Sequence, residues 1–248
     1  MLVRGERACY GEAIGILCYD VKEPFIPGDV ANATTFDFPV RYKILKGVSC
    51  DFLCKNAKAQ SDSIEKMIEG VQELEKEGVR AITMNCGYSA ILQEELSNAV
   101  KVPVFTSSLM QVPLVSRMLG RKQKVGILAA SKSLLTRAHL ETVGIDESIP
   151  VIIAGMDEAV EFNKVFGFGE KPEQLILDTE ALEREVVTVA RELVKKDEAI
   201  GAMVLECSNI PPYTAAIQEA VKLPIFDYIT LINWVYQAVV KKRYVGFM

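Results

Sequence analysis

The stretch AVKVPVF at residues 99–105 recurs 121 positions later as AVKLPIF at residues 220–226, with five of the seven residues identical. A second echo pairs IGIL at residues 14–17 with VGIL at residues 125–128, at a different offset. A spacing of this length far exceeds the period of a solenoid repeat. The sequence therefore predicts two similar domains rather than an array of small units.

The duplication also aligns two cysteines. At the offset of 121, AITMNCG at residues 81–87 corresponds to AMVLECS at residues 202–208, which places Cys86 over Cys207. Each half thus contains an apolar segment that ends in a cysteine, followed by a helical pattern and a second apolar segment.

Local patterns predict alternating helices and strands. The motif DSIE at residues 62–65 has the residues of a helix N-cap, and the apolar run 79–84 that follows this helix is short enough for a strand. In the second half, a cap at Asp178 or Thr179 opens a helix, and residues 200–205 form the matching strand. Such βαβ units predict parallel sheets covered on both faces.

We therefore expect an α/β protein of two similar, doubly wound parallel-sheet domains related by pseudo-two-fold symmetry. The first domain is predicted to span residues 1–112, and the second residues 113–226. A C-terminal helix within residues 227–248 is expected to pack back on the first domain. Ligands of such sheets bind beyond the carboxyl ends of the strands, so the active site is expected between the two domains.

Composition excludes several classes of protein. The 248 residues are 50% apolar and 25% charged, with 28 basic and 33 acidic residues and a net charge of −5. This acidic balance argues against a nucleic-acid partner or an anionic membrane surface. No signal peptide or membrane-spanning run is recognisable, so we expect a cytoplasmic protein whose six cysteines are free thiols. With one histidine and no paired cysteine motif, no metal site is expected.

Cys86 and Cys207 are the candidate catalytic residues. Each is predicted to follow a buried strand and precede a helix, where the helix dipole favours a thiolate and lowers the pKa of a thiol. If the two copies face each other, the two thiols flank one bound molecule. Inversion of a carbon centre needs one group that takes a proton from one face and another that delivers a proton to the opposite face.

Residues next to the cysteines are candidates for substrate binding. Their backbone N–H groups at a helix start could hold a carboxylate. These residues are Gly87, Tyr88 and Ser89 after the first cysteine and Ser208 and Asn209 after the second. Asp20 and Glu206 fall near strand ends on the same side of the sheet, although a turn role for Asp20 and an outward-pointing Glu206 are the favoured interpretations.

These motifs resemble the aspartate/glutamate/hydantoin racemase superfamily. The resemblance covers nearly the whole chain in order: IGIL, the MNCG motif ending at Gly87, VPVF, VGIL and the LECSN motif at residues 205–209. It implies two similar α/β domains, no cofactor, and Cys86 and Cys207 as paired acid/base thiols. The function it implies is racemisation or epimerisation of a small carboxylate-bearing compound, such as an amino acid or a hydantoin-like derivative.

The resemblance extends to the remaining candidate site residues, although this sequence departs from the family pattern at some of these positions. The segment at residues 130–133 is similar to the carboxylate-binding loop of the family, which makes Ser131 and Ser133 candidate substrate contacts. Glutamate racemases carry an aspartate and a serine after their first strand, where this chain has Cys18 and Tyr19. Tyr19 and Asp20 are therefore candidate contacts, and an α-amino acid substrate is favoured only if Asp20 points into the cleft.

Other functions remain open at this point. The same superfamily fold supports isomerisation of a cis diacid and decarboxylation of malonate-like acids, and a two-lobed chain could instead be a non-catalytic small-molecule sensor. We also expect a homo-oligomer, a dimer or higher. The irregular stretch at residues 25–42 is a candidate active-site cover or a surface loop that packs on a partner subunit, and Arg41 within it is a candidate carboxylate clamp or a surface residue.

Overall fold

The repeated segments form equivalent strands in two four-stranded parallel sheets. The structure is a computed structural model that describes residues 5–7, 9–53, 61–168 and 175–248. Strand order is the same in both sheets, β2-β1-β3-β4 and β6-β5-β7-β8, which confirms the predicted fold class. The strands are β1 Ile14–Tyr19, β2 Val40–Leu45, β3 Ala81–Met84, β4 Val104–Phe105, β5 Lys124–Ala129, β6 Val151–Gly155, β7 Ile200–Leu205 and β8 Ile225–Phe226.

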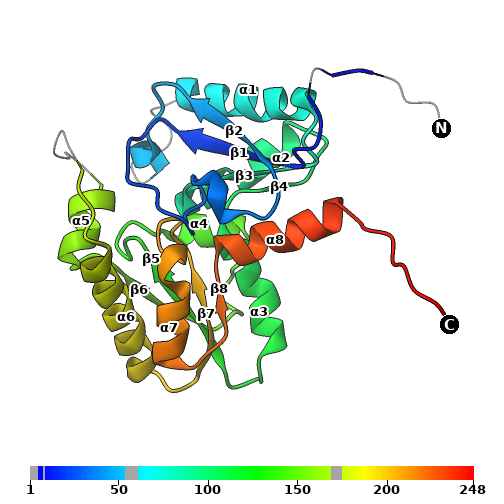
Figure 1. Cartoon of the computed structure of the whole chain (residues 1–248). Helices are drawn as coiled ribbons and strands as arrows, with labels where there is room; N and C mark the ends of the chain where they lie inside the picture. Colours follow the sequence, from blue (N-terminus) through cyan, green and yellow to red (C-terminus); the bar gives the residue numbers. More distant parts are fainter. Residues whose placement is uncertain (1–4, 8, 54–60, 169–174) are drawn as a thin grey trace.

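Helices connect and cover these strands, as Figure 1 shows. The α-helices are α1 Ser61–Glu77, α2 Gln93–Asn98, α3 Val112–Met118, α4 Arg137–Thr142, α5 Val160–Phe166, α6 Thr179–Lys196, α7 Thr214–Val221 and α8 Tyr228–Val239. Short 3₁₀ helices are η1 Ala33–Thr35, η2 Cys50–Leu53, η4 Gly87–Leu92, η5 Ser108–Gln111 and η6 Pro211–Tyr213. The predicted helix cap at Asp178 is confirmed, since its side chain accepts a hydrogen bond from the Ala181 N–H.

The first sheet is covered on both faces by helices from opposite ends of the chain. Met67, Val71 and Leu74 of α1 are fully buried in one core that also contains Leu17 of β1. On the other face, Tyr228, Leu231 and Ile232 of α8 pack with Ile14, Ile16 and Ala81 in a second core. Figure 1 shows α1 and α8 on opposite sides of this sheet.

The two halves share a continuous interior. Leu17 of the first sheet and Leu205 of the second belong to one cluster of buried apolar side chains. The carboxyl ends of strands from both sheets are therefore held in a fixed relation. The domain boundaries expected from the sequence stay a prediction.

The stretch at residues 25–42 is irregular only as far as residue 39. Its end belongs to β2, which begins at Val40 and pairs with β1. Arg41 lies on this strand and forms ion pairs with Glu12 and Glu77, at 2.7 and 3.2 Å. Of the two interpretations of Arg41, the surface one is therefore correct, because its guanidinium is engaged at this edge of the sheet.

Within the described ranges, no helix has the length and apolar character needed to cross a membrane.

Candidate active site

A cavity of about 460 Å³ lies where the strands of both sheets end. Its wall comes from the segments that follow β1 and β3 in the first half and β5 and β7 in the second. The remaining wall comes from Ser49 and the start of η2, from the end of α5 with the two residues after it, and from Leu175. The lining residues are Tyr19, Asp20, Val21, Lys22, Glu23, Ser49, Cys50, Asp51, Asn85, Cys86, Gly87, Tyr88, Ala130, Phe166, Gly167, Phe168, Leu175, Glu206, Cys207, Ser208 and Asn209.

Both candidate catalytic cysteines line this cavity. Cys86 is half-buried and is the N-cap residue of η4, as expected for a cysteine that precedes a helix. Cys207 is buried, and three residues separate it from η6, so only Cys86 stands directly at a helix start. A cavity that contains both thiols can place one small molecule against each of them.

The expectation that a helix dipole lowers the pKa of Cys207 is wrong. Burial raises the pKa of this thiol well above its ordinary value, and the nearby carboxylates of Glu206, Asp29 and Glu23 raise it further. Only the backbone N–H of Asn209 acts in the opposite direction. Desolvation therefore favours the protonated thiol at Cys207.

Main-chain and side-chain hydrogen bonds join the two halves around the cysteines. The Ser208 hydroxyl donates to the main-chain oxygen of Asn85 at 2.7 Å. Tyr88 is almost fully buried, and its hydroxyl donates to the Ser131 carbonyl at 2.8 Å and accepts from the Ser131 N–H at 2.9 Å. These contacts fix the spacing between the two cysteine segments.

Ser131 and Ser133 do not line the cavity. Both hydroxyls donate to Oδ1 of Asp157, at 2.6 and 2.9 Å, and Oδ2 of the same carboxylate accepts the Lys132 N–H at 2.8 Å. The serines therefore order their own loop, whose carbonyl at Ser131 holds Tyr88. Their predicted contact with a substrate carboxylate would require these bonds to Asp157 to be exchanged.

Tyr19, the last residue of β1, and Asp20, which follows it, both line the cavity. Tyr19 lines the cavity and its hydroxyl is 2.9 Å from that of Ser89, which is fully buried outside the lining. Asp20 lines the cavity at its exposed edge and accepts the Gly47 N–H at 2.9 Å. Asp20 thus combines the expected turn role with a place at the cavity edge.

Glu206 is a fully buried carboxyl group in the cavity wall. Its Oε2 accepts the Ala130 N–H at 3.0 Å, whereas Oε1 has no hydrogen-bond partner among the described residues. Burial raises the pKa of Glu206 to about 7. The sequence interpretation of Glu206 as an outward-pointing residue is wrong, because β7 is buried on both faces and leaves no exposed side at its end.

Asp29 reaches the second cysteine from the first half of the chain. Its Oδ2 accepts a hydrogen bond from Asn209 Nδ2 at 2.9 Å, and its Oδ1 accepts the Ala31 N–H at 2.7 Å. Asn209 Oδ1 in turn accepts from the Cys207 thiol at 3.5 Å. Burial raises the pKa of Asp29 to about 7, opposed by its hydrogen bonds from Ala31 and Asn209.

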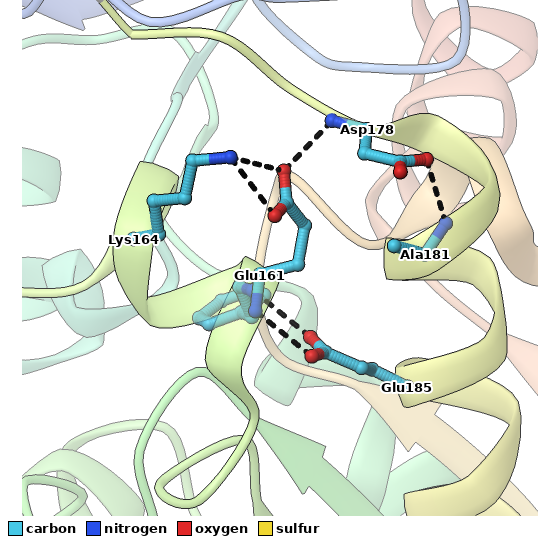
Figure 2. Close-up of polar contacts among 6 residues, drawn as sticks. Glu161, Lys164, Asp178, Ala181 and Glu185 are labelled. Carbon is cyan, nitrogen blue, oxygen red and sulfur yellow. Dashed lines mark hydrogen bonds and ion pairs between the residues drawn. The ribbon is translucent and has the colours of Figure 1, made fainter.

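Two anchoring carboxylates position α5, whose end forms part of the wall. Both oxygens of Glu185 on α6 accept N–H groups at the start of α5, from Glu161 at 2.8 Å and Phe162 at 3.0 Å. Glu161 accepts the Asp178 N–H at 2.7 Å and pairs with Lys164 at 3.0 Å, as Figure 2 shows. This network fixes α5 against the start of α6.

We expect Glu185→Ala to lower the free energy of unfolding by about 1–2 kcal/mol, because two N–H groups at a helix start lose their acceptor. Glu185→Gln keeps one amide oxygen and should lose less. Urea denaturation measures both changes. The matched control is Glu183→Ala on the exposed side of the same helix, and an equal loss in that control would show that Glu185 is no anchor.

In the described part of the chain, no group of three or more His, Cys, Asp or Glu side chains is placed to hold a metal ion.

Comparison with known proteins gives a family and a fold. A family model described as Asp/Glu/Hydantoin racemase matches residues 47–234. Among curated proteins, the chain is 27% identical over 229 residues to dimethylsulfoniopropionate lyase 3 of Emiliania huxleyi, covering 89% of this chain and 58% of that protein. It is 28% identical to a dimethylsulfoniopropionate lyase of Durusdinium sp. clade D, covering 88% of this chain and 71% of that protein.

Solved structures resemble the chain in fold. An aspartate racemase homologue from Pyrococcus horikoshii matches with a TM-score of 0.58 and 17% identity, over 92% of this chain and 99% of that one. The Gly74Cys mutant of arylmalonate decarboxylase matches with a TM-score of 0.57 and 15% identity, over 91% and 92% of the two chains. The chain spans about three fifths of the length of the Emiliania huxleyi lyase.

Proposed function

Because the chain belongs to the Asp/Glu/hydantoin racemase family, we propose that it removes the proton from the carbon next to the carboxylate of a small molecule, with a cysteine thiolate as the base. The observation that carries this proposal is the presence of Cys86 and Cys207 in one cavity at the ends of equivalent strands. Removal of such a proton is the first step shared by racemisation and by elimination.

For the fate of the resulting carbanion, we favour elimination of a leaving group from the next carbon. The curated relatives that cover most of this chain are named for a lyase reaction on dimethylsulfoniopropionate. In that reaction class, the electron pair of the broken C–H bond forms a C=C bond while the C–S bond breaks. Dimethylsulfoniopropionate would thereby give acrylate, dimethyl sulfide and a proton held by the thiol.

The charges of the wall support a substrate that carries both a cation and a carboxylate. Four acidic side chains line the cavity, those of Asp20, Glu23, Asp51 and Glu206, against the cation of Lys22. Aromatic rings of Tyr19, Phe166 and Phe168 stand in the same wall. Acidic groups and ring faces favour a sulfonium or ammonium group, while Lys22 favours the carboxylate.

Racemisation is the second candidate, and the specific observation in its favour is the second thiol. Elimination needs one base, whereas inversion of a carbon centre needs a base on one face and an acid on the other. Cys86 and Cys207 together would supply both groups. The acidic side chains and aromatic rings of the wall suit the ammonium group of an α-amino acid as they suit a sulfonium group, and Lys22 suits its carboxylate.

Proton NMR in deuterium oxide tests the proposal with four probes: dimethylsulfoniopropionate, L-aspartate, L-glutamate and phenylmalonate. Acrylate signals indicate elimination, and loss of the α-proton signal with inversion indicates racemisation. Elimination supports α-proton removal by a thiolate when one of the variants Cys86→Ala and Cys207→Ala abolishes it, and racemisation does so when each variant abolishes it. Decarboxylation of phenylmalonate, or binding that survives both substitutions without turnover of any probe, would contradict the proposal in favour of a decarboxylase or a sensor.

A further inference from the structure

The two thiols of the cavity differ in their surroundings, and the difference involves Asn209 together with Asp29, which lies outside the cysteine motifs. Cys207 is 6% exposed, whereas Cys86 is half-buried at the start of η4. The Cys207 thiol donates a hydrogen bond to Oδ1 of Asn209 at 3.5 Å. An amide oxygen accepts hydrogen bonds and cannot donate them, so this contact forms only while Cys207 carries its proton.

Asp29 decides which atom of the Asn209 amide faces the thiol. An ionised carboxylate only accepts hydrogen bonds, so above the Asp29 pKa of about 7 the amide nitrogen of Asn209 must point toward Asp29 Oδ2, 2.9 Å away. The amide oxygen is thereby left to face Cys207. Without Asp29, the amide could rotate by half a turn and present its N–H groups to the sulfur, which would stabilise a thiolate.

Asp29 itself is held rigidly although it belongs to an irregular loop. Its other oxygen accepts the Ala31 N–H at 2.7 Å, and its side chain is buried. The preceding residue, Gly28, has a φ of 102° and lies so close to Pro212 that a Cβ would overlap the proline. The loop is thus fastened to the segment that follows Cys207.

We propose, on the basis of the proposed function, that Cys86 is the proton-abstracting base and Cys207 the resident thiol acid, and that Asp29 maintains this difference through Asn209. Asp29 and Asn209 are positioning residues in this assignment. The Cys86 thiolate takes the α-proton and becomes a thiol. In racemisation, the Cys207 S–H gives its proton to the opposite face of the carbanion and becomes a thiolate; in elimination, Cys207 stays protonated.

The charges around Cys207 act in the same direction. Burial raises the pKa of this thiol, and Glu206, Asp29 and Glu23 raise it further. Lys22, Asp20 and Asp51 also line the cavity that the two cysteines share. The Asn209 N–H is the opposing contact.

The test follows the pH dependence of iodoacetamide labelling, measured by mass spectrometry on the peptides of Cys86 and Cys207 separately. Each rate is expressed relative to the limiting rate of the same thiol at high pH, which removes the effect of accessibility. We expect Cys86 to reach half of its limiting rate at a lower pH than Cys207, with about a tenfold difference in normalised rate at pH 8, the ratio that one pKa unit produces.

Asp29→Asn removes the charge and frees the Asn209 amide to turn, so it should move the Cys207 profile toward lower pH and leave that of Cys86 in place. Asp37→Asn, an exposed aspartate of the same loop, is the matched control and should change neither profile. Asn209→Ala removes the acceptor and should move the Cys207 profile in the same direction, which provides a second variant if Asp29→Asn folds poorly.

Equal profiles for the two cysteines, or a Cys207 profile at lower pH than that of Cys86, would overturn the assignment. So would equal shifts in Asp29→Asn and Asp37→Asn. Because labelling requires no turnover, its failure leaves the proposed function standing. If the protein turns over no carboxylate but the labelling profiles of Cys86 and Cys207 differ as expected, only the proposed function is contradicted.

Discussion

Cys86→Ala should lower turnover of the substrate by about 10² to 10⁴-fold, the usual contribution of a general acid or base. Cys207→Ala should cause a loss of the same size in a racemisation, because the two thiols then act as one unit. In an elimination the loss should be smaller for Cys207→Ala than for Cys86→Ala. Steady-state rates of the two variants and the wild type, measured on the probe that reacts, give these values.

Cys18→Ala is the matched control for the cysteine substitutions. Cys18 is buried in the core beneath the first sheet and does not line the cavity, and burial raises its pKa to about 12. Its replacement should leave kcat within a few-fold of wild type. Full activity in both Cys86→Ala and Cys207→Ala would remove any thiol mechanism.

The second large effect concerns stability against pH. Glu206 has a folded pKa of about 7 against 4.5 for the ordinary carboxyl group. The unfolded chain therefore ionises this group from about pH 4.5, while the folded chain keeps the proton until about pH 7. Between these values the folded state binds more protons, so its free energy of unfolding falls as pH rises.

Glu206→Gln removes this dependence because an amide does not ionise. Relative to wild type, the variant should gain roughly 3 kcal/mol in unfolding free energy between pH 4.5 and pH 8. Urea denaturation across this range measures the difference. Glu198→Gln, an exposed glutamate, should show no such trend, and a pH-independent difference between Glu206→Gln and wild type would show that Glu206 is ionised in the folded chain.

Much of the fold could be predicted from the duplicated segments. The offset of 121 residues matches β4 to β8 residue by residue, since Val104–Phe105 corresponds to Ile225–Phe226. The start of β2 at Val40 is harder to predict, because prolines, threonines and one glycine in the preceding loop conceal it. The strand β2 mixes apolar and charged residues, and its pairing with β1 is visible only in the folded sheet.

Within the site, residues adjacent to a motif could be predicted and distant partners could not. The duplicated motifs lead directly to Cys86, Gly87, Cys207 and Ser208 in the cavity wall. Asp29 was missed because it lies 180 residues before Asn209, with no repeat or spacing to connect them. The burial of Glu206 could have been predicted, since the all-apolar strand before it indicates burial on both faces.

The aromatic residues of the cavity wall could not be predicted from the sequence either. Phe166 ends the short helix α5 and Phe168 follows it, and the position of this helix depends on the carboxylates of Glu161 and Glu185. Nothing in the sequence around Phe166 distinguishes a cavity wall from ordinary core. Only the packing of α5 against α6 brings these rings to the cavity.

The most direct test of the central claim is the exchange of the α-hydrogen of a carboxylate substrate with solvent deuterium. The substrate is the probe that reacts, held with wild-type protein or the Cys86→Ala/Cys207→Ala double variant in deuterium oxide and followed by proton NMR. The account predicts that the wild type breaks the α C–H bond, seen as deuterium incorporation or as loss of the α-proton on elimination, and that the double variant leaves it intact. Cleavage of this bond at the wild-type rate by the double variant would contradict the account.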